Sequence, residues 1–139
     1  MGDGAVSLLF LKNDETFLDM NNRSAMTVVT YGDRKMLFAA DVEKAGQEQM
    51  MKRIAPEVLK SDIIKYPHHA KSEMDMAFYN AVGAKLAIVT SVEGRGDLGQ
   101  SFLKYRGLPT VYTGVKGMFI HLVTDGKYWL CEYVPITVE

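Results

Sequence analysis

The alternation of apolar and polar stretches along the chain predicts a regular succession of short strands and helices. Apolar runs of strand length, most of them bounded by turn residues, occur at 6–12, 25–31, 35–40, 62–66, 86–90, 110–112, 118–124 and 128–134. Helical spacing or helix-stop residues mark the segments 43–55, 73–82 and 100–106. The order is a hairpin, then strands alternating with helices, then a second hairpin. This order predicts an α/β fold with a mixed β-sheet and flanking helices.

Turn and cap residues predict where these elements begin and end. Glycine-containing pairs at 32–33 and 125–126 predict the two hairpins, and turns are expected at 13–15 and 21–22. We expect Val6–Lys12 to be a buried strand. Pro56 should end the first helix, Ser72 should cap the second, and Gly83 should stop it.

Two of the predicted strands end at residues that can bind metals. Asp41 follows the strand at 35–40, and His68 and His69 follow the strand at 62–66. Strands joined by a crossover helix lie parallel, so their C-terminal ends share one sheet edge, where open α/β sheets place ligands. We therefore expect the three residues to face a common site, with donors that suit zinc. The spacing leaves two alternatives open: Asp41 caps the following helix, and the histidines belong to a surface loop.

Length, composition and charge set broad limits on the class of protein. The length of 139 residues predicts a single domain over 1–139, and the hydrophobic content is that of an ordinary globular protein. The net charge of −1 gives no general attraction to nucleic acid or anionic membranes. No apolar run has transmembrane length and no signal peptide is visible, so the cytoplasm is slightly favoured. The single cysteine, Cys131, excludes an internal disulfide and is expected to be an inert thiol.

The residues around the two strand ends resemble the metallo-β-lactamase-fold hydrolases, and most closely the ComEC-type competence branch. Asn21–Val29 followed by Met36–Asp41 is similar to that family's Asn-Asn-x-Ser turn, strand and Leu-Leu-x-Gly-Asp. Lys65–Lys71 is similar to its strand ending in His-His-Gly-Ser, and the resemblance extends over roughly residues 5 to 133. It implies that Asp41 bridges two metal ions, that His69 is a metal ligand, and that His68 faces the substrate as a catalytic residue.

The departures from the family pattern decide which part of the domain the chain resembles. The family's main metal motif, His-x-His-x-Asp-His, is absent, and the glycine after the histidine pair is Ala70. The chain thus resembles half of an αββα metallo-β-lactamase-like sandwich, with the N-terminal half absent. The resemblance implies the C-terminal part of a metal-dependent hydrolase of phosphoesters or nucleic acid. It also implies that a complete domain binds two ions of zinc or manganese. In this chain, the resemblance implies that metal binding is weak or absent and that the isolated chain is inactive.

Two other functions, and the association of the chain, follow from the same residues. The first alternative is a non-catalytic binding or assembly module that keeps the fold. A more distant one is a nucleotide-binding module using the G-x-G-x-x-G pattern at Gly94–Gly99, although no acidic residue ends the next strand. His121, in an alternating strand, is expected to be structural. A half-sandwich leaves one apolar sheet face bare, which predicts a homodimer or pairing with the missing half, unless the hairpin at 118–134 covers that face.

Overall fold

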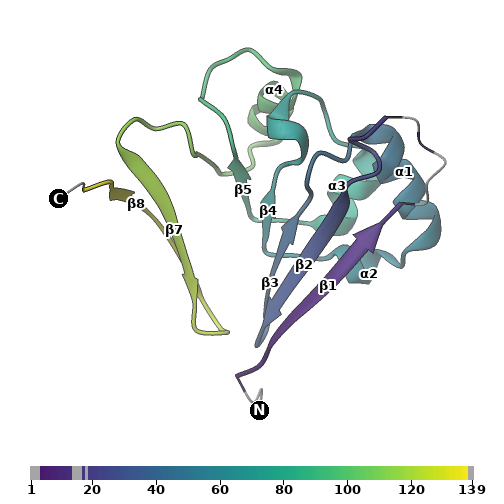
Figure 1. The fold of residues 1–139 in the computed structure, drawn as a ribbon, viewed down its shortest axis with the longest axis horizontal. Helices are drawn as coiled ribbons and strands as arrows, with labels where there is room; N and C mark the ends of the chain where they lie inside the picture. Colours follow the sequence, from purple (N-terminus) through teal and green to yellow (C-terminus); the bar gives the residue numbers. More distant parts are fainter. Residues whose placement is uncertain (1–3, 14–16, 18, 138–139) are drawn as a thin grey trace.

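The computed structural model describes residues 4–13, 17 and 19–137, and it shows a mixed α/β fold (Figure 1). Within these residues, six strands form one sheet in the order β1-β2-β3-β4-β5-β6, and β7 and β8 form a separate hairpin. Strands β1 to β3 are antiparallel neighbours, whereas β3 to β6 run parallel. The elements are β1 (Val6–Lys12), β2 (Ala25–Tyr31), β3 (Arg34–Phe38), α1 (Lys44–Arg53), α2 (Pro56–Leu59), β4 (Ile63–Lys65), the helical turn η1 (Pro67–Ala70), α3 (Met76–Val82), β5 (Leu86–Val89), α4 (Leu98–Arg106), β6 (Thr110–Tyr112), β7 (Met118–Thr124) and β8 (Trp129–Pro135).

One face of the six-stranded sheet packs against the helices, which Figure 1 shows gathered on the side opposite the β7–β8 hairpin. Successive side chains of a strand point to opposite faces, so residues paired across neighbouring strands share a face. Here the shared row is Val28, Leu37, Ile64 and Ala87. This row and apolar residues of all four helices form one buried core, whose helical members include Met50, Leu59, Phe78 and Leu103.

The β7–β8 hairpin lies over part of the other face. Met36, Ile63 and Ile88 form a second apolar cluster with residues of the hairpin, namely Ile120, Leu122 and Trp129. The hairpin is attached at both ends. At its turn, the Asp33 amide donates to the Gly126 carbonyl at 2.9 Å, and at its base the Tyr133 hydroxyl accepts from the Tyr112 amide at 2.9 Å. The hairpin therefore spans the sheet as a strap.

The predicted α/β class, the order of strands and helices, and both hairpin turns are confirmed. Gly83 ends α3 in a left-handed conformation with φ 57°, as expected for a helix stop. The turn predicted at 13–15 lies outside the described residues apart from Asn13. Among the described residues, no helix is both long and apolar enough to cross a bilayer.

Three expectations about individual elements are wrong. Strand β1 is an exposed edge strand, with Phe10 67% accessible, because it lies at the end of the strand order and β2 is its neighbour among the described strands. Pro56 begins α2, since its fixed φ suits the first turn of a helix. Asp75, and not Ser72, caps α3, because its carboxylate accepts from the Phe78 amide at 2.9 Å.

Candidate functional site

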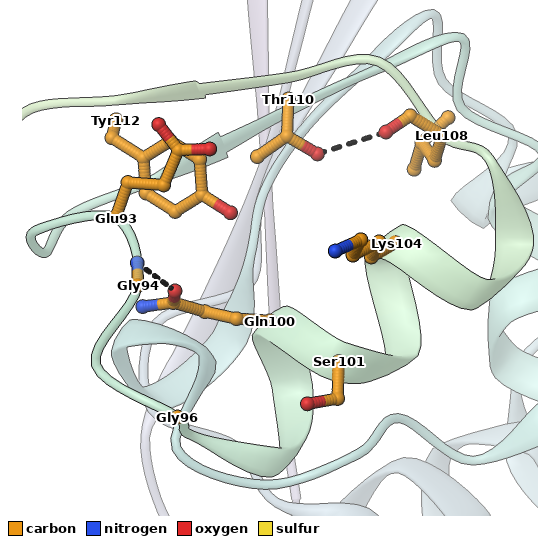
Figure 2. Close-up of a pocket in the computed structure, with 9 residues that line it drawn as sticks. All are labelled: Glu93, Gly94, Gly96, Gln100, Ser101, Lys104, Leu108, Thr110 and Tyr112. Carbon is orange, nitrogen blue, oxygen red and sulfur yellow. Dashed lines mark hydrogen bonds between the residues drawn. The ribbon is translucent and has the colours of Figure 1, made fainter.

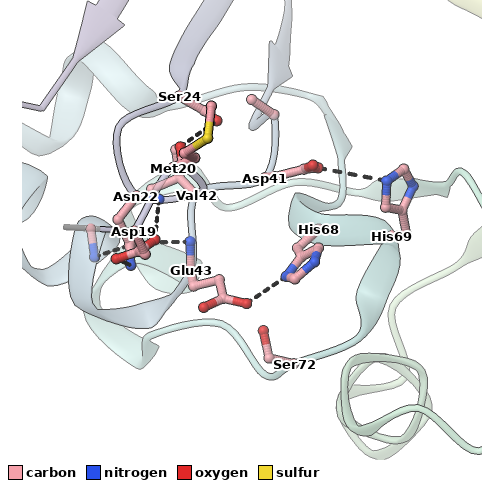
Figure 3. Close-up of polar contacts among 12 residues, drawn as sticks. Asp19, Met20, Asn22, Ser24, Asp41, Val42, Glu43, His68, His69 and Ser72 are labelled. Carbon is pink, nitrogen blue, oxygen red and sulfur yellow. Dashed lines mark hydrogen bonds and ion pairs between the residues drawn. The ribbon is translucent and has the colours of Figure 1, made fainter. Parts of the chain in front are cut away.

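The candidate site lies at the C-terminal ends of the parallel strands β3, β4 and β5 (Figure 3). Asp41 follows β3, His68 and His69 follow β4, and Thr90 follows β5. The structure brings Asp41 and His69 together, with 3.8 Å between Asp41 Oδ1 and His69 Nε2. The ring of His68 lies beside that of His69, with 6.3 Å between the ring centroids. The convergence that the strand–helix–strand connectivity predicts is therefore present.

Thr90 sets the orientation of the His69 ring. His69 Nδ1 lies 3.1 Å from the Thr90 carbonyl oxygen and 2.8 Å from its Oγ1. A carbonyl oxygen can only accept, so the contact with the Thr90 carbonyl favours the tautomer with the hydrogen on Nδ1, in which a neutral ring has its lone pair on Nε2. That lone pair is on the nitrogen nearest Asp41. Metal-binding histidines are commonly held in this way, by a second hydrogen bond from the other ring nitrogen.

His68 has a different carboxylate partner. Its Nδ1 lies 2.5 Å from Glu43 Oε1, and its side chain is only 17% exposed. An ionised carboxylate accepts, so this contact places the hydrogen on Nδ1 and leaves Nε2 able to take a proton. A histidine oriented by a carboxylate is the arrangement that general bases use. Figure 3 shows the two carboxylate–imidazole pairs side by side.

Lys65 places a cation against Asp41. Its Nζ lies 3.6 Å from Asp41 Oδ1 and donates to the Ala40 carbonyl oxygen at 2.8 Å. Burial lowers the pKa of the Lys65 ammonium below its ordinary value, and the Asp41 carboxylate opposes that shift. The charge of Asp41 is thus already balanced within the chain.

The backbone around the site is held in left-handed conformations. Ala40 has φ 49°, and His68, His69 and Ala70 form a consecutive run with φ 45°, 55° and 60°. Residues with a Cβ atom rarely adopt this region, and each such residue costs roughly 1–2 kcal/mol. Such strain gathers at functional sites and persists only where the surrounding packing imposes it. Here it turns both histidine side chains toward the strand ends.

Asn22 anchors the segment that follows Asp41. Its buried side-chain Oδ1 accepts from the amides of Glu43 and Gly46, at 3.0 and 2.9 Å, and so caps the start of α1. Asp19 in turn accepts from the Asn22 amide at 2.8 Å, and the hydrogen bonds from Asn22 lower the pKa of that carboxyl. The alternative in which Asp41 caps this helix is wrong, because Asn22 accepts the hydrogen bonds at the start of α1. Asp41 instead contacts His69 and Lys65.

The glycine-rich loop at Gly94–Gly99 has a structural explanation. Figure 2 shows it beside a cavity of about 490 Å³ between the loop, α4 and β6. The Gly94 amide, which a phosphate would need, donates instead to Gln100 Oε1 at 2.9 Å. A Cβ on Gly99 would lie 2.5 Å from the Ala70 carbonyl oxygen, so this glycine lets α4 approach the histidine turn. Neither contact supports nucleotide binding.

Three residues of the site were not predicted. Thr90 ends the next parallel strand, so the strand-end reasoning that found Asp41 could have found it. Glu43 carried no signal beyond its place near a helix start, and Lys65 stands inside an apolar run.

His121 pairs with Glu132 on the hairpin at 3.1 Å, away from the site. Burial raises the pKa of the Cys131 thiol, as expected of an unreactive cysteine.

Within residues 4–13, 17 and 19–137, no group of three or more His, Cys, Asp or Glu side chains is arranged to hold one metal ion. The pair of Asp41 and His69 suits a metal in donor type and in the orientation of the imidazole, but it gives two ligands. No protein-family model and no curated protein sequence matches this chain.

Proposed function

We propose that this chain supplies the C-terminal part of a metal-dependent hydrolase site, in which Asp41 and His69 are metal ligands. The observation that carries the proposal is the position of His69 Nε2, 3.8 Å from Asp41 Oδ1, while the other ring nitrogen, Nδ1, lies 3.1 Å from the Thr90 carbonyl oxygen. Two ligands on one zinc ion lie a little closer together than this, so a small movement would let both bind.

A catalytic zinc usually has three protein ligands, so the pair needs a further donor from outside the described residues. The isolated chain should therefore bind zinc or manganese weakly. In a complete site the ion would polarise a phosphoryl or carbonyl oxygen of the substrate. His68, oriented by Glu43, would take or deliver the proton that the hydrolysis requires. Phosphoesters are the substrate class favoured by the resemblance to the metallo-β-lactamase-fold family.

A second function, a non-catalytic binding module, is favoured by one contact. The Lys65 ammonium lies 3.6 Å from Asp41 Oδ1, where it offsets the charge of this carboxylate. Under this hypothesis Lys65 holds the strand ends together in place of a metal. The fold would then serve recognition or assembly alone.

Calorimetric titration with Zn²⁺ and Mn²⁺ separates the two functions. The metal-site proposal predicts weak binding at one ion per chain, lost in Asp41→Asn and in His69→Gln and retained in His121→Gln, a control on the distant hairpin. Lys65→Met should tighten binding at least about tenfold, because it removes a repelling charge beside the ligands. If Lys65→Met binds zinc no more tightly than the parent chain, or if Asp41→Asn and His69→Gln bind it as well as the parent does, the assignment of Asp41 and His69 as metal ligands is wrong and the non-catalytic module is favoured.

A further inference from the structure

Two cavities of different polarity lie near the candidate site: one is lined by Lys65 and Thr90, and the other by His69 and Thr90. The larger is a groove of about 640 Å³ between the six-stranded sheet and the β7–β8 strap. Its walls are mainly apolar, and they include Met36, Phe38, Ile88, Ile120, Leu122 and Trp129. A volume in the range of roughly 300–1,000 Å³ with apolar walls is typical of small-molecule sites. The strap is held at both ends, so the groove is part of the fold.

The second cavity, of about 490 Å³, is more polar than the groove and lies at the strand ends; it is called the polar cavity below. Two cationic side chains, those of Lys71 and Arg95, line it together with the imidazole of His69. The one carboxylate among its lining residues, Asp97, lies 3.7 Å from Arg95 Nε and offsets part of that charge. Arg95 remains 59% exposed, so its guanidinium is accessible to a ligand. The cavity therefore favours an anion.

The two cavities share two lining residues. Thr90 and Thr113, which follow β5 and β6, line both the apolar groove and the polar cavity. Thr90 also holds the ring of His69, and Lys65, which contacts Asp41, lines the groove. A molecule that occupied both cavities would thus pass the candidate site at the junction of its apolar and charged parts.

We propose that the groove and the polar cavity together bind an alkyl phosphate. The alkyl chain lies between the sheet and the strap, and the phosphate lies against Lys71 and Arg95, next to His69. A charged headgroup of the opposite sign to the cavity fixes the direction in which the ligand lies. This inference deepens the proposed function by naming its substrate class and rests on it for the reaction, but binding of the alkyl phosphate needs no metal.

Trp129 is the single tryptophan of the chain and lines the groove, so its fluorescence reports binding directly. The full chain is titrated with decyl phosphate below its micelle concentration, and with octyl phosphate, decanol, decyltrimethylammonium and inorganic phosphate. Decyl phosphate should bind one per chain and shift the Trp129 emission. It should bind about tenfold more tightly than octyl phosphate, because two more methylenes are buried. Decanol and decyltrimethylammonium should bind more weakly, and inorganic phosphate should leave the emission unchanged.

Variants test the two ends of the ligand separately. Phe38→Glu places a charge in the groove wall at a side chain that is 42% exposed, and should weaken decyl phosphate binding at least about tenfold. Val6→Glu, at a more exposed wall position, gives the same test if Phe38→Glu fails to fold. Arg95→Gln should weaken the binding of decyl phosphate several-fold and leave the binding of decanol unaffected. Lys44→Gln, at an exposed position of α1, should change the binding of neither.

The proposal is overturned if decyl phosphate leaves the Trp129 emission unchanged, if chain length has no effect, or if decyltrimethylammonium binds equally well. Failure of this binding alongside an intact zinc response of the Asp41–His69 pair would refute the alkyl phosphate site alone. Loss of the zinc response with intact decyl phosphate binding would refute the hydrolase proposal alone.

Discussion

Replacing Ala40 by glycine should stabilise the protein. Ala40 has φ 49° immediately before Asp41, a conformation that costs an L-residue with a Cβ roughly 1–2 kcal/mol and glycine almost nothing. Glycine also gains freedom in the unfolded chain, which opposes the benefit by roughly 0.4–1 kcal/mol. The difference predicts that Ala40→Gly raises the free energy of unfolding by about 0.5–1 kcal/mol.

Two neighbouring alanines provide matched comparisons. Ala39 is fully buried and is not among the left-handed residues, so Ala39→Gly should lower the free energy of unfolding by about 1–2 kcal/mol. Ala70 is both left-handed and fully buried, so relief of strain and loss of a buried methyl should nearly cancel. Urea unfolding followed by Trp129 fluorescence gives the midpoints at constant m-value. If Ala40→Gly destabilises the protein as much as Ala39→Gly, the left-handed conformation is not a source of strain.

Three further predictions concern packing, pH and association. Gly99→Ala should lower the free energy of unfolding by about 1–3 kcal/mol, because its Cβ would meet the Ala70 carbonyl, and an unchanged urea midpoint would contradict this. Burial raises the pKa of the Tyr66 hydroxyl, so above pH 10 the unfolded state releases a proton that the folded state keeps. The free energy of unfolding should therefore fall by up to about 1.4 kcal/mol per pH unit. Tyr66→Phe should reduce this loss, whereas Tyr128→Phe, at an exposed position, should not. Sedimentation at micromolar concentration should show a dimer that Phe10→Glu dissociates, because β1 is at the edge of the sheet and exposes apolar side chains such as Phe10. A monomeric parent chain would refute the dimer.

The meeting of Asp41 with His69 could be predicted because it depends on connectivity alone. An apolar run that ends in a polar residue marks the end of a buried strand, and a crossover helix makes the next strand parallel. The two strand ends then share one edge, whatever the details of packing. The same reasoning extends to Thr90, which follows the next parallel strand and contacts the His69 ring.

Other features depend on contacts that no local pattern contains. The partner of His68 is Glu43, 25 residues away, and the cap of α1 is Asn22, on a separate turn. An apolar run cannot distinguish a central strand from an edge strand, which is why β1 was expected to be buried. Ala40 and Ala70 have left-handed backbone angles, which favour glycine, and the alanines at these positions give no sign of that conformation.

Zinc titration followed by long-range ¹H–¹⁵N NMR of the imidazole rings tests the metal-site proposal most directly. The three histidines of the chain give separate signals, so His69 can be compared with His68 and with the distant His121. We predict that zinc shifts the Nε2 resonance of His69 while its Nδ1 stays protonated against Thr90, and that His121 does not change. Zinc that shifts His121 alone, or that leaves His69 Nε2 unchanged at millimolar concentration, would contradict the proposal.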